Sequence, residues 1–185
     1  MPSTDRPLPA LRDDEMTPEQ RALAAEMAGA RGGAVGGPFA LLLRVPEIGA
    51  RVNALSERLR KNSGFEKRLV ELLVLVITRD WNAQYAWTAH VRQALEEGIA
   101  PDAIEAIRSG ATPSFARDDE RLMYEVVSEL IRTHALSDAT YARAVAGFGL
   151  ERTIELVTTA GLYTTISMLL ATFRIPATNG ERTLA

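Results

Sequence analysis

A glutamate and a histidine on neighbouring predicted helices are the residues of this sequence best placed to do chemistry. Glu71 lies inside the apolar run LVELLVLVI, and His90 lies in the following segment WNAQYAWTAH. Asp80 separates the two and can cap the second helix, so the chain turns back there and brings both side chains together. A glutamate bonded to a histidine fixes the imidazole tautomer and suits general acid–base catalysis. A satisfied core histidine is the structural alternative.

The residues around His90 leave space beside its ring. A helix that starts near residue 81 is expected to place on one face Ala83, Ala86, Trp87, His90 and Ala94. The alanines leave room for a small ligand, and the rings of Trp87 and Tyr85 are expected to wall that room. Trp81 is expected either to line the same pocket or to anchor the turn before the helix.

The composition excludes several classes of function. The 185 residues include no cysteine, so disulfides, iron–sulfur clusters and thiol redox cycles are absent. His90 and Glu71 supply only two metal ligands, so no metal is expected and a metal-dependent enzyme is a weaker alternative. The 21 basic and 24 acidic residues give no basic footprint, so no nucleic-acid partner is expected.

Helix start and stop signals predict an all-α bundle of about eight helices. Thr17-Pro18-Glu19-Gln20 forms a capping box, and Pro38 and Pro46 can each start a helix. The apolar spacing of Ile48, Val52, Leu55 and Leu59 marks the expected buried face of the helix after Pro46. Further helices are expected at about 66–78, 81–97, 101–110, 118–134, 137–147 and 151–173. We expect an extended arm over 1–16, one helical domain over 17–176 and a tail over 177–185.

Two other segments invite functional interpretations that the residues do not favour. The glycine-rich stretch ARGGAVGGP lacks the Lys-Ser/Thr ending of a phosphate loop, so a flexible connection is expected. The uncharged segment 156–173 approaches the length of a membrane span, but its threonines favour a helix buried on the core or on a neighbouring subunit. No membrane partner is expected, and because the N-terminus has no apolar signal region, the cytoplasm is the expected location.

The segment from Glu71 to Gly98 resembles the signature of the carboxymuconolactone decarboxylase family, which includes the alkylhydroperoxidase-like fold. The peroxidase branch has Glu, eleven residues, Cys-x-His-Cys, three residues and His. That spacing is kept here from Glu71 to His90, but Ala83 and Ala86 replace both cysteines. Alanine cannot attack a peroxide, so the resemblance implies a cysteine-less branch without peroxidase activity.

The decarboxylase branch is similar to Tyr-Glu-Trp-x-x-His, which Tyr85, Trp87 and His90 match and Ala86 does not. The resemblance implies an alkylhydroperoxidase-like bundle, a trimer or hexamer, and decarboxylation without a cofactor. The implied substrate is a small carboxylated lactone such as 4-carboxymuconolactone, met in aromatic-compound catabolism. The alternative is a ligand-binding or scaffold member that has lost its chemistry, since the glutamate common at the position of Ala86 is absent.

The resemblance also implies roles for individual residues. His90 is the expected proton donor, with Glu71 as its orienting partner. Tyr85 is expected to donate a hydrogen bond to the lactone oxygen. Arg44, on the preceding helix, is the expected clamp for an anionic substrate.

Overall fold

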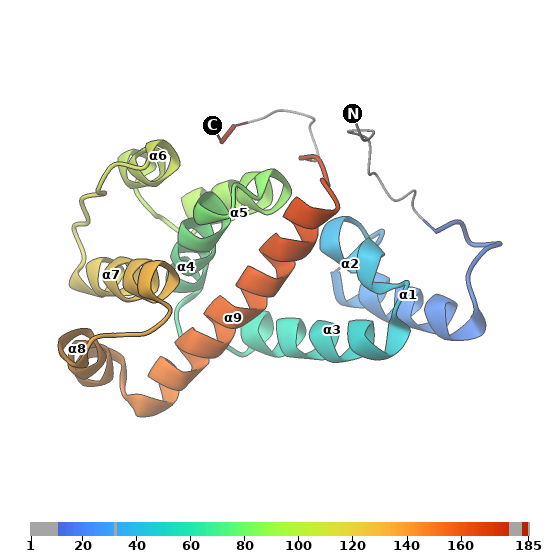
Figure 1. Ribbon diagram of the computed structural model, residues 1–185, viewed down its shortest axis with the longest axis horizontal. Helices are drawn as coiled ribbons and strands as arrows, with labels where there is room; N and C mark the ends of the chain where they lie inside the picture. The colour runs from blue at the N-terminus through green and yellow to red at the C-terminus, as the bar shows by residue number, and fades with distance from the viewer. Residues whose placement is uncertain (1–10, 32, 178–182, 185) are drawn as a thin grey trace.

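The computed structural model describes residues 11–31, 33–177 and 183–184, and over these residues the chain is all-α, as predicted (Figure 1). The helices of the described part are α1 (Pro18–Arg31), α2 (Gly37–Leu42), α3 (Pro46–Lys61), α4 (Lys67–Asp80), α5 (Gln84–Glu96), α6 (Pro101–Ser109), α7 (Asp118–Thr133), α8 (Asp138–Phe148) and α9 (Leu150–Thr172). Helices α2 and α3 are separate because Val45 precedes a proline and adopts φ −131° and ψ 69°, which is not helical.

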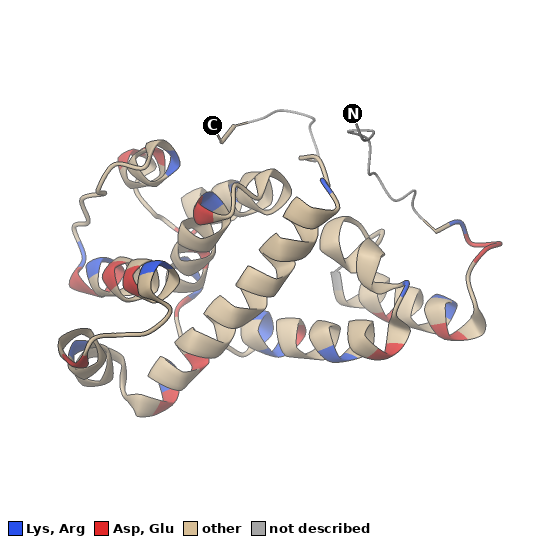
Figure 2. Cartoon of the chain, viewed as in Figure 1, with Lys and Arg blue, Asp and Glu red and all other residues tan. Residues whose placement is uncertain are grey.

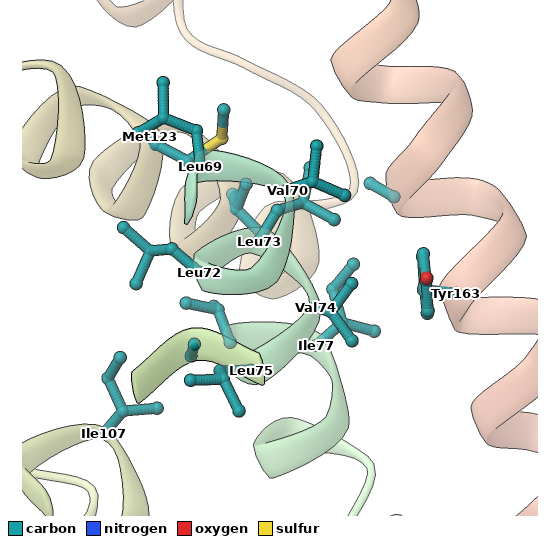
Figure 3. Packing of buried hydrophobic residues seen from close by; sticks show 14 of the residues in the cluster. Leu69, Val70, Leu72, Leu73, Val74, Leu75, Ile77, Ile107, Met123 and Tyr163 are labelled. Carbon is teal, nitrogen blue, oxygen red and sulfur yellow. The ribbon is translucent and has the colours of Figure 1, made fainter. Parts of the chain in front are cut away.

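Helix α4 lies at the centre of the fold. All of its residues from Arg68 to Thr78 are buried, and it packs against α5, α6, α7 and α9. Figure 3 shows its side chains pointing to several sides, with Val74 and Ile77 facing Tyr163 of α9. Because the helix is covered on all sides, apolar side chains dominate its sequence, and the buried Arg68 and Glu71 each need a partner.

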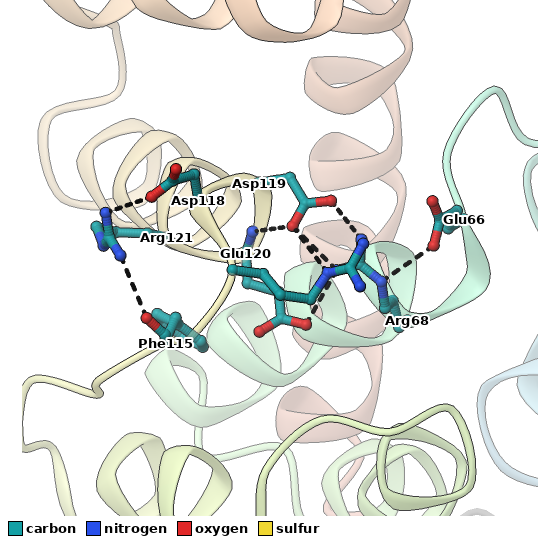
Figure 4. A network of polar contacts seen from close by, with 8 residues as sticks. Glu66, Arg68, Phe115, Asp118, Asp119, Glu120 and Arg121 are labelled. Atoms are coloured by element: carbon teal, nitrogen blue, oxygen red, sulfur yellow. Dashed lines mark hydrogen bonds and ion pairs between the residues drawn. The ribbon is translucent and has the colours of Figure 1, made fainter.

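A buried arginine joins α4 to the start of α7 (Figure 4). The side chain of Arg68 is 8% exposed. Its guanidinium lies 3.1 Å from Oε2 of Glu66 and 3.0 Å from Oε1 of Glu120, and it also binds the Asp119 carboxylate. The hydrogen bond from Arg68 holds the pKa of Asp119 below its usual range. The acidic residues in the first turn of α7 therefore have two stabilising interactions. They pair with Arg68 of α4, and their negative charge is favourable at a helix N-terminus.

The described end of the chain returns to the first turn of α5. The Oε1 atom of Gln84 accepts hydrogen bonds from the backbone N–H groups of Thr183 at 2.9 Å and Leu184 at 3.1 Å. Its Nε2 atom donates to the Leu184 carbonyl at 2.9 Å, and the Leu184 side chain is buried in the core. The parts of the predicted arm and tail outside the described residues are 1–10, 178–182 and 185.

Helix α9 is long and apolar enough to cross a membrane by length and composition, and 44% of its most apolar window is buried inside the chain. One helix of this kind is weak evidence for a membrane span, and its packing on α2, α3, α4 and α8 agrees with the predicted core helix. Figure 2 shows its charged residues confined to its first turns. Its outer face exposes Ile154, Val157 and Met168.

The buried ion pairs of Arg68 yield a prediction about stability. We expect Arg68→Ala to lower the free energy of unfolding by about 3–5 kcal/mol, because the buried Glu120 carboxylate loses its partner. Urea unfolding followed by circular dichroism at pH 7 measures the change. Since the pKa of Asp119 is lowered in the folded state, the part of the stability that depends on it is present above the carboxyl's unfolded pKa. It is lost as the pH falls through the folded pKa.

Arg121→Ala is the matched control at the same helix end. Arg121 pairs with Asp118 at 2.7 Å, but these side chains are 49% and 94% exposed. Removing this exposed pair should cost about 1 kcal/mol or less. Equal losses from the two substitutions would contradict the central place given to Arg68.

Candidate functional site

The structure brings Glu71 and His90 together. The Nδ1 atom of His90 lies 2.6 Å from Oε2 of Glu71, across the contact between α4 and α5. The side chain of His90 is 14% exposed and that of Glu71 is 6% exposed. Because Nδ1 is occupied by the carboxylate, Nε2 is the ring nitrogen left for a ligand.

The turn between α4 and α5 sets this geometry. Asn82 adopts a left-handed backbone conformation, with φ 49°. The N–H of Ala83 donates to the carbonyl of Thr78 at 2.8 Å, and the N–H of Asn82 donates to that of Arg79 at 3.1 Å. These two bonds form a Schellman motif, which ends α4 and redirects the chain. Helix α5 therefore begins at Gln84, later than the predicted start near residue 81.

A cavity of about 260 Å³ lies beside His90. Its walls come from the segment before α2 and from α2, α3, α5 and α9: Ala34, Gly36, Pro38, Phe39, Ser56, Arg60, Tyr85, Ala86, Ala89, His90, Gln93, Tyr163 and Ile166. The Tyr163 ring meets the His90 ring edge to face, with centroids 5.4 Å apart. Ala86 and Ala89 leave the open space next to the imidazole.

Tyr85 is fixed by the glycine-rich segment before α2. A Cβ atom on Gly37 would lie 2.3 Å from Cε1 of Tyr85, and one on Gly36 would lie 3.2 Å from its hydroxyl oxygen. Gly37 has φ +56°, a conformation that favours glycine. The stretch expected as a flexible connection thus forms a cavity wall against an aromatic ring. Burial raises the pKa of the Tyr85 phenol, so it stays protonated near neutral pH and can donate a hydrogen bond.

Four residues expected to bind a ligand lie away from this cavity. Trp87 is buried and borders a separate pocket beside α6, because it is rotated by about 100° around α5 from Ala86. Trp81 and Ala83 line another cavity, of about 630 Å³, beside the end of α9. Arg44 lies in the turn between α2 and α3 and does not line the cavity beside His90.

Three polar residues of the cavity were not predicted from the sequence: Ser56, Arg60 and Gln93. On α3, the face predicted to be buried is not the one that packs inward. Two of its residues are largely outside the core, since Ile48 is 58% exposed and Leu55 is 39% exposed. The buried face of α3 instead carries Gly49, Asn53, Ser56 and Leu59. Two signals were available: Ser56 and Arg60 are one helical turn apart, and Gln93 follows His90 by three residues.

Residues 46–128 match the family model described as Carboxymuconolactone decarboxylase family. Over these residues the chain is similar to this family. A comparison with curated proteins gave no match. The matched segment holds Glu71, Tyr85 and His90, whereas Gly37 and Tyr163 lie outside it, so the family segment supplies only part of the cavity.

No three His, Asp or Glu side chains in the described ranges are grouped so that they could hold a metal ion. What the site offers is one histidine oriented by a carboxylate, one protonated phenol and a small space between them. This arrangement can transfer a proton and stabilise a negatively charged oxygen.

The contact between Gly37 and Tyr85 predicts a large effect of one methyl group. We expect Gly37→Ala to lower the free energy of unfolding by about 1–3 kcal/mol, because the backbone is left-handed and the Cβ atom overlaps the ring. Urea unfolding gives the loss, and near-ultraviolet circular dichroism reports the displacement of the tyrosine.

Gly33→Ala is the control in the same segment, because nothing lies within 4 Å of a Cβ atom there. It should change stability by about 0.5 kcal/mol or less. The double variant Gly37→Ala/Tyr85→Ala should lose less than the sum of its single substitutions, since the overlap disappears. Full additivity would show that the ring and the glycine do not interact.

Proposed function

We propose that this protein is a cofactor-independent decarboxylase of a small carboxylated lactone, with 4-carboxymuconolactone as the first substrate to test. The observation that carries the proposal is the 2.6 Å contact between His90 and the buried Glu71 beside a small cavity. The match of residues 46–128 to the carboxymuconolactone decarboxylase family supports a related function in general. The cavity of about 260 Å³ is smaller than a typical drug-sized site of about 300–1,000 Å³, which suits a substrate with one ring.

The reaction needs a proton but no external electron carrier. The bond between the ring carbon and its carboxylate breaks, carbon dioxide leaves, and the electron pair enters the unsaturated lactone as a dienolate. A carbon of the dienolate then takes one proton, so each turnover consumes one proton and releases one carbon dioxide. The lactone acts as its own electron sink, so no other group has to accept the electrons.

In the proposed mechanism, protonated His90 gives the proton to carbon from Nε2. Glu71 keeps the ring oriented through Nδ1 and balances the charge of the imidazolium. After the transfer, the neutral imidazole retains its Nδ1 proton, and Nε2 takes a new proton from solvent. Tyr85 donates a hydrogen bond to the lactone oxygen, where negative charge develops, because its buried phenol remains protonated.

We also propose that the chain assembles with itself, as a trimer or hexamer, through the outer face of α9. Ile154 is 59% exposed, Val157 is 42% exposed and Met168 is 40% exposed on this face, and α9 carries no charged residue after Glu155. Burying such a face in a second copy would remove apolar surface from water.

The roles of the pair predict a loss of turnover. We expect His90→Gln to lower kcat for 4-carboxymuconolactone by about 100-fold or more, because the proton donor is lost. Glu71→Gln should lower it by about 10-fold to 100-fold, since the imidazole loses its orienting charge. Ultraviolet absorbance of the lactone measures turnover, and the urea midpoint shows that each variant is folded.

His134→Asn is the control, because His134 ends α7 on the surface and asparagine accepts its left-handed backbone of φ 61°. It should keep full activity. Undiminished turnover in His90→Gln would overturn the mechanism. A wild-type protein that binds lactone acids but releases no carbon dioxide would favour the alternative, a ligand-binding member without catalysis.

The proposed assembly predicts a change in mass. Wild-type protein should elute as a trimer or hexamer by size-exclusion chromatography with light scattering. Ile154→Glu should shift it toward the monomer, because a charge would be buried at the contact. Tyr141→Glu, on the exposed outer side of α8 and 49% exposed before substitution, is the control and should leave the mass unchanged. A monomeric wild type would refute the assembly.

A further inference from the structure

The cavity beside His90 has an unbalanced charge. Of the described residues that line it, Arg60 is the only arginine or lysine, and none is an aspartate or glutamate. The carboxylate of Glu71 is engaged by Nδ1 of the imidazole. The open part of the cavity therefore presents a cation to any ligand, together with neutral hydrogen-bonding groups.

The partner of Arg60 does not cancel this charge. Glu57 lies 3.3 Å from Nη1 of Arg60, but it also lies 2.6 Å from Nζ of Lys61. One carboxylate is thus shared between two cations, and the group of three keeps one net positive charge. The Arg60 side chain is 40% exposed, so it can reach a ligand while its stem stays on α3.

Arg60 also lies at the boundary of a second cavity. This neighbouring cavity, of about 270 Å³, is lined by Arg60 and Gln93 together with Lys61, Lys67 and Glu71. Arg60 and Gln93 line both spaces, so they form part of the wall between them. Lys67 is paired with Glu97 at 2.7 Å, and Lys61 shares Glu57 with Arg60, so the net positive charge of the group formed by Arg60, Lys61 and Glu57 is what this wall offers to an anion.

The chemistry of decarboxylation decides which carboxylate a cation should hold. An ion pair with the leaving carboxylate would stabilise the ground state and disappear in the product, so it would oppose bond cleavage. A carboxylate that is retained through the reaction pays no such penalty, and binding it fixes the orientation of the ring. The leaving carboxylate then belongs away from Arg60, in the less polar space walled by Ala86 and Ala89.

We propose that Arg60 binds the retained carboxylate of a lactone that carries two carboxylates, one lost and one kept. The planar guanidinium grips that carboxylate through two N–H groups, and Gln93 adds a neutral hydrogen bond. The identity of the lost group rests on the proposed function, whereas the anion site itself does not. Arg60 thereby takes the place that the sequence had suggested for Arg44.

The test compares two saturated lactones that cannot be decarboxylated: (5-oxotetrahydrofuran-2-yl)acetate and its primary amide. Isothermal titration calorimetry on the full chain measures both. Wild-type protein should bind the acid at least about tenfold more tightly than the amide. Arg60→Gln should remove this preference without changing the affinity for the amide, and Arg60→Lys should keep part of it, because the charge remains but the fork is lost.

Arg58→Gln is the matched control, because it removes the same charge from an exposed residue of α3 that does not line the cavity. It should leave both affinities unchanged. Equal binding of acid and amide by the wild type, or an unchanged preference in Arg60→Gln, would overturn the proposal.

The two proposals fail separately. Acid-selective binding through Arg60 without release of carbon dioxide would remove the decarboxylase and leave the anion site. Turnover of 4-carboxymuconolactone with the same KM in Arg60→Gln and wild type would remove the anion site and leave the decarboxylase. If both proposals hold, Arg60→Gln raises KM at least about tenfold and changes kcat much less, because the residue binds a group that does not react.

Discussion

Helix α4 is buried on every side from Arg68 to Thr78, and this burial dictates where the two charged side chains within that stretch find partners. A charge in such a place is costly unless another group compensates it. Arg68 meets the acidic start of α7, and Glu71 meets His90 of α5. Arg68 thus joins α4 to α7, and Glu71 places the candidate site against α4. Because α4 is the central helix, the Glu71 end of the site lies inside the bundle.

Only part of the candidate site lies in the segment that matches the family. The matched segment contains Glu71 and His90, while the glycine-rich segment and α9 close the space around them. Tyr163 from α9 packs on the ring of His90, and Gly37 fixes the neighbouring Tyr85. The chemistry can therefore be common to relatives while the shape of the ligand space is set by elements outside the shared segment.

The sequence was sufficient for the all-α fold and for the meeting of Glu71 with His90, because helix punctuation and a short turn leave few arrangements. It was insufficient wherever a rotation about a helix axis mattered. The left-handed Asn82 delays the start of α5, and the true inner face of α3 lies one residue from the one its apolar side chains suggested. The shift on α3 hid Arg60, and Trp87 faces another pocket because it lies about 100° around α5 from Ala86. The packing of Tyr85 on Gly37 joins distant segments, which no local pattern reports.

That packing also has an evolutionary consequence. Any side chain at position 37 would occupy the volume of the tyrosine ring, so the two positions cannot drift independently. A lineage that loses the glycine must first shrink the residue at position 85, and would thereby open the ligand space toward the N-terminal helices. The pair acts as one heritable unit, through which relatives with the same acid–base pair can diverge toward ligands of different size.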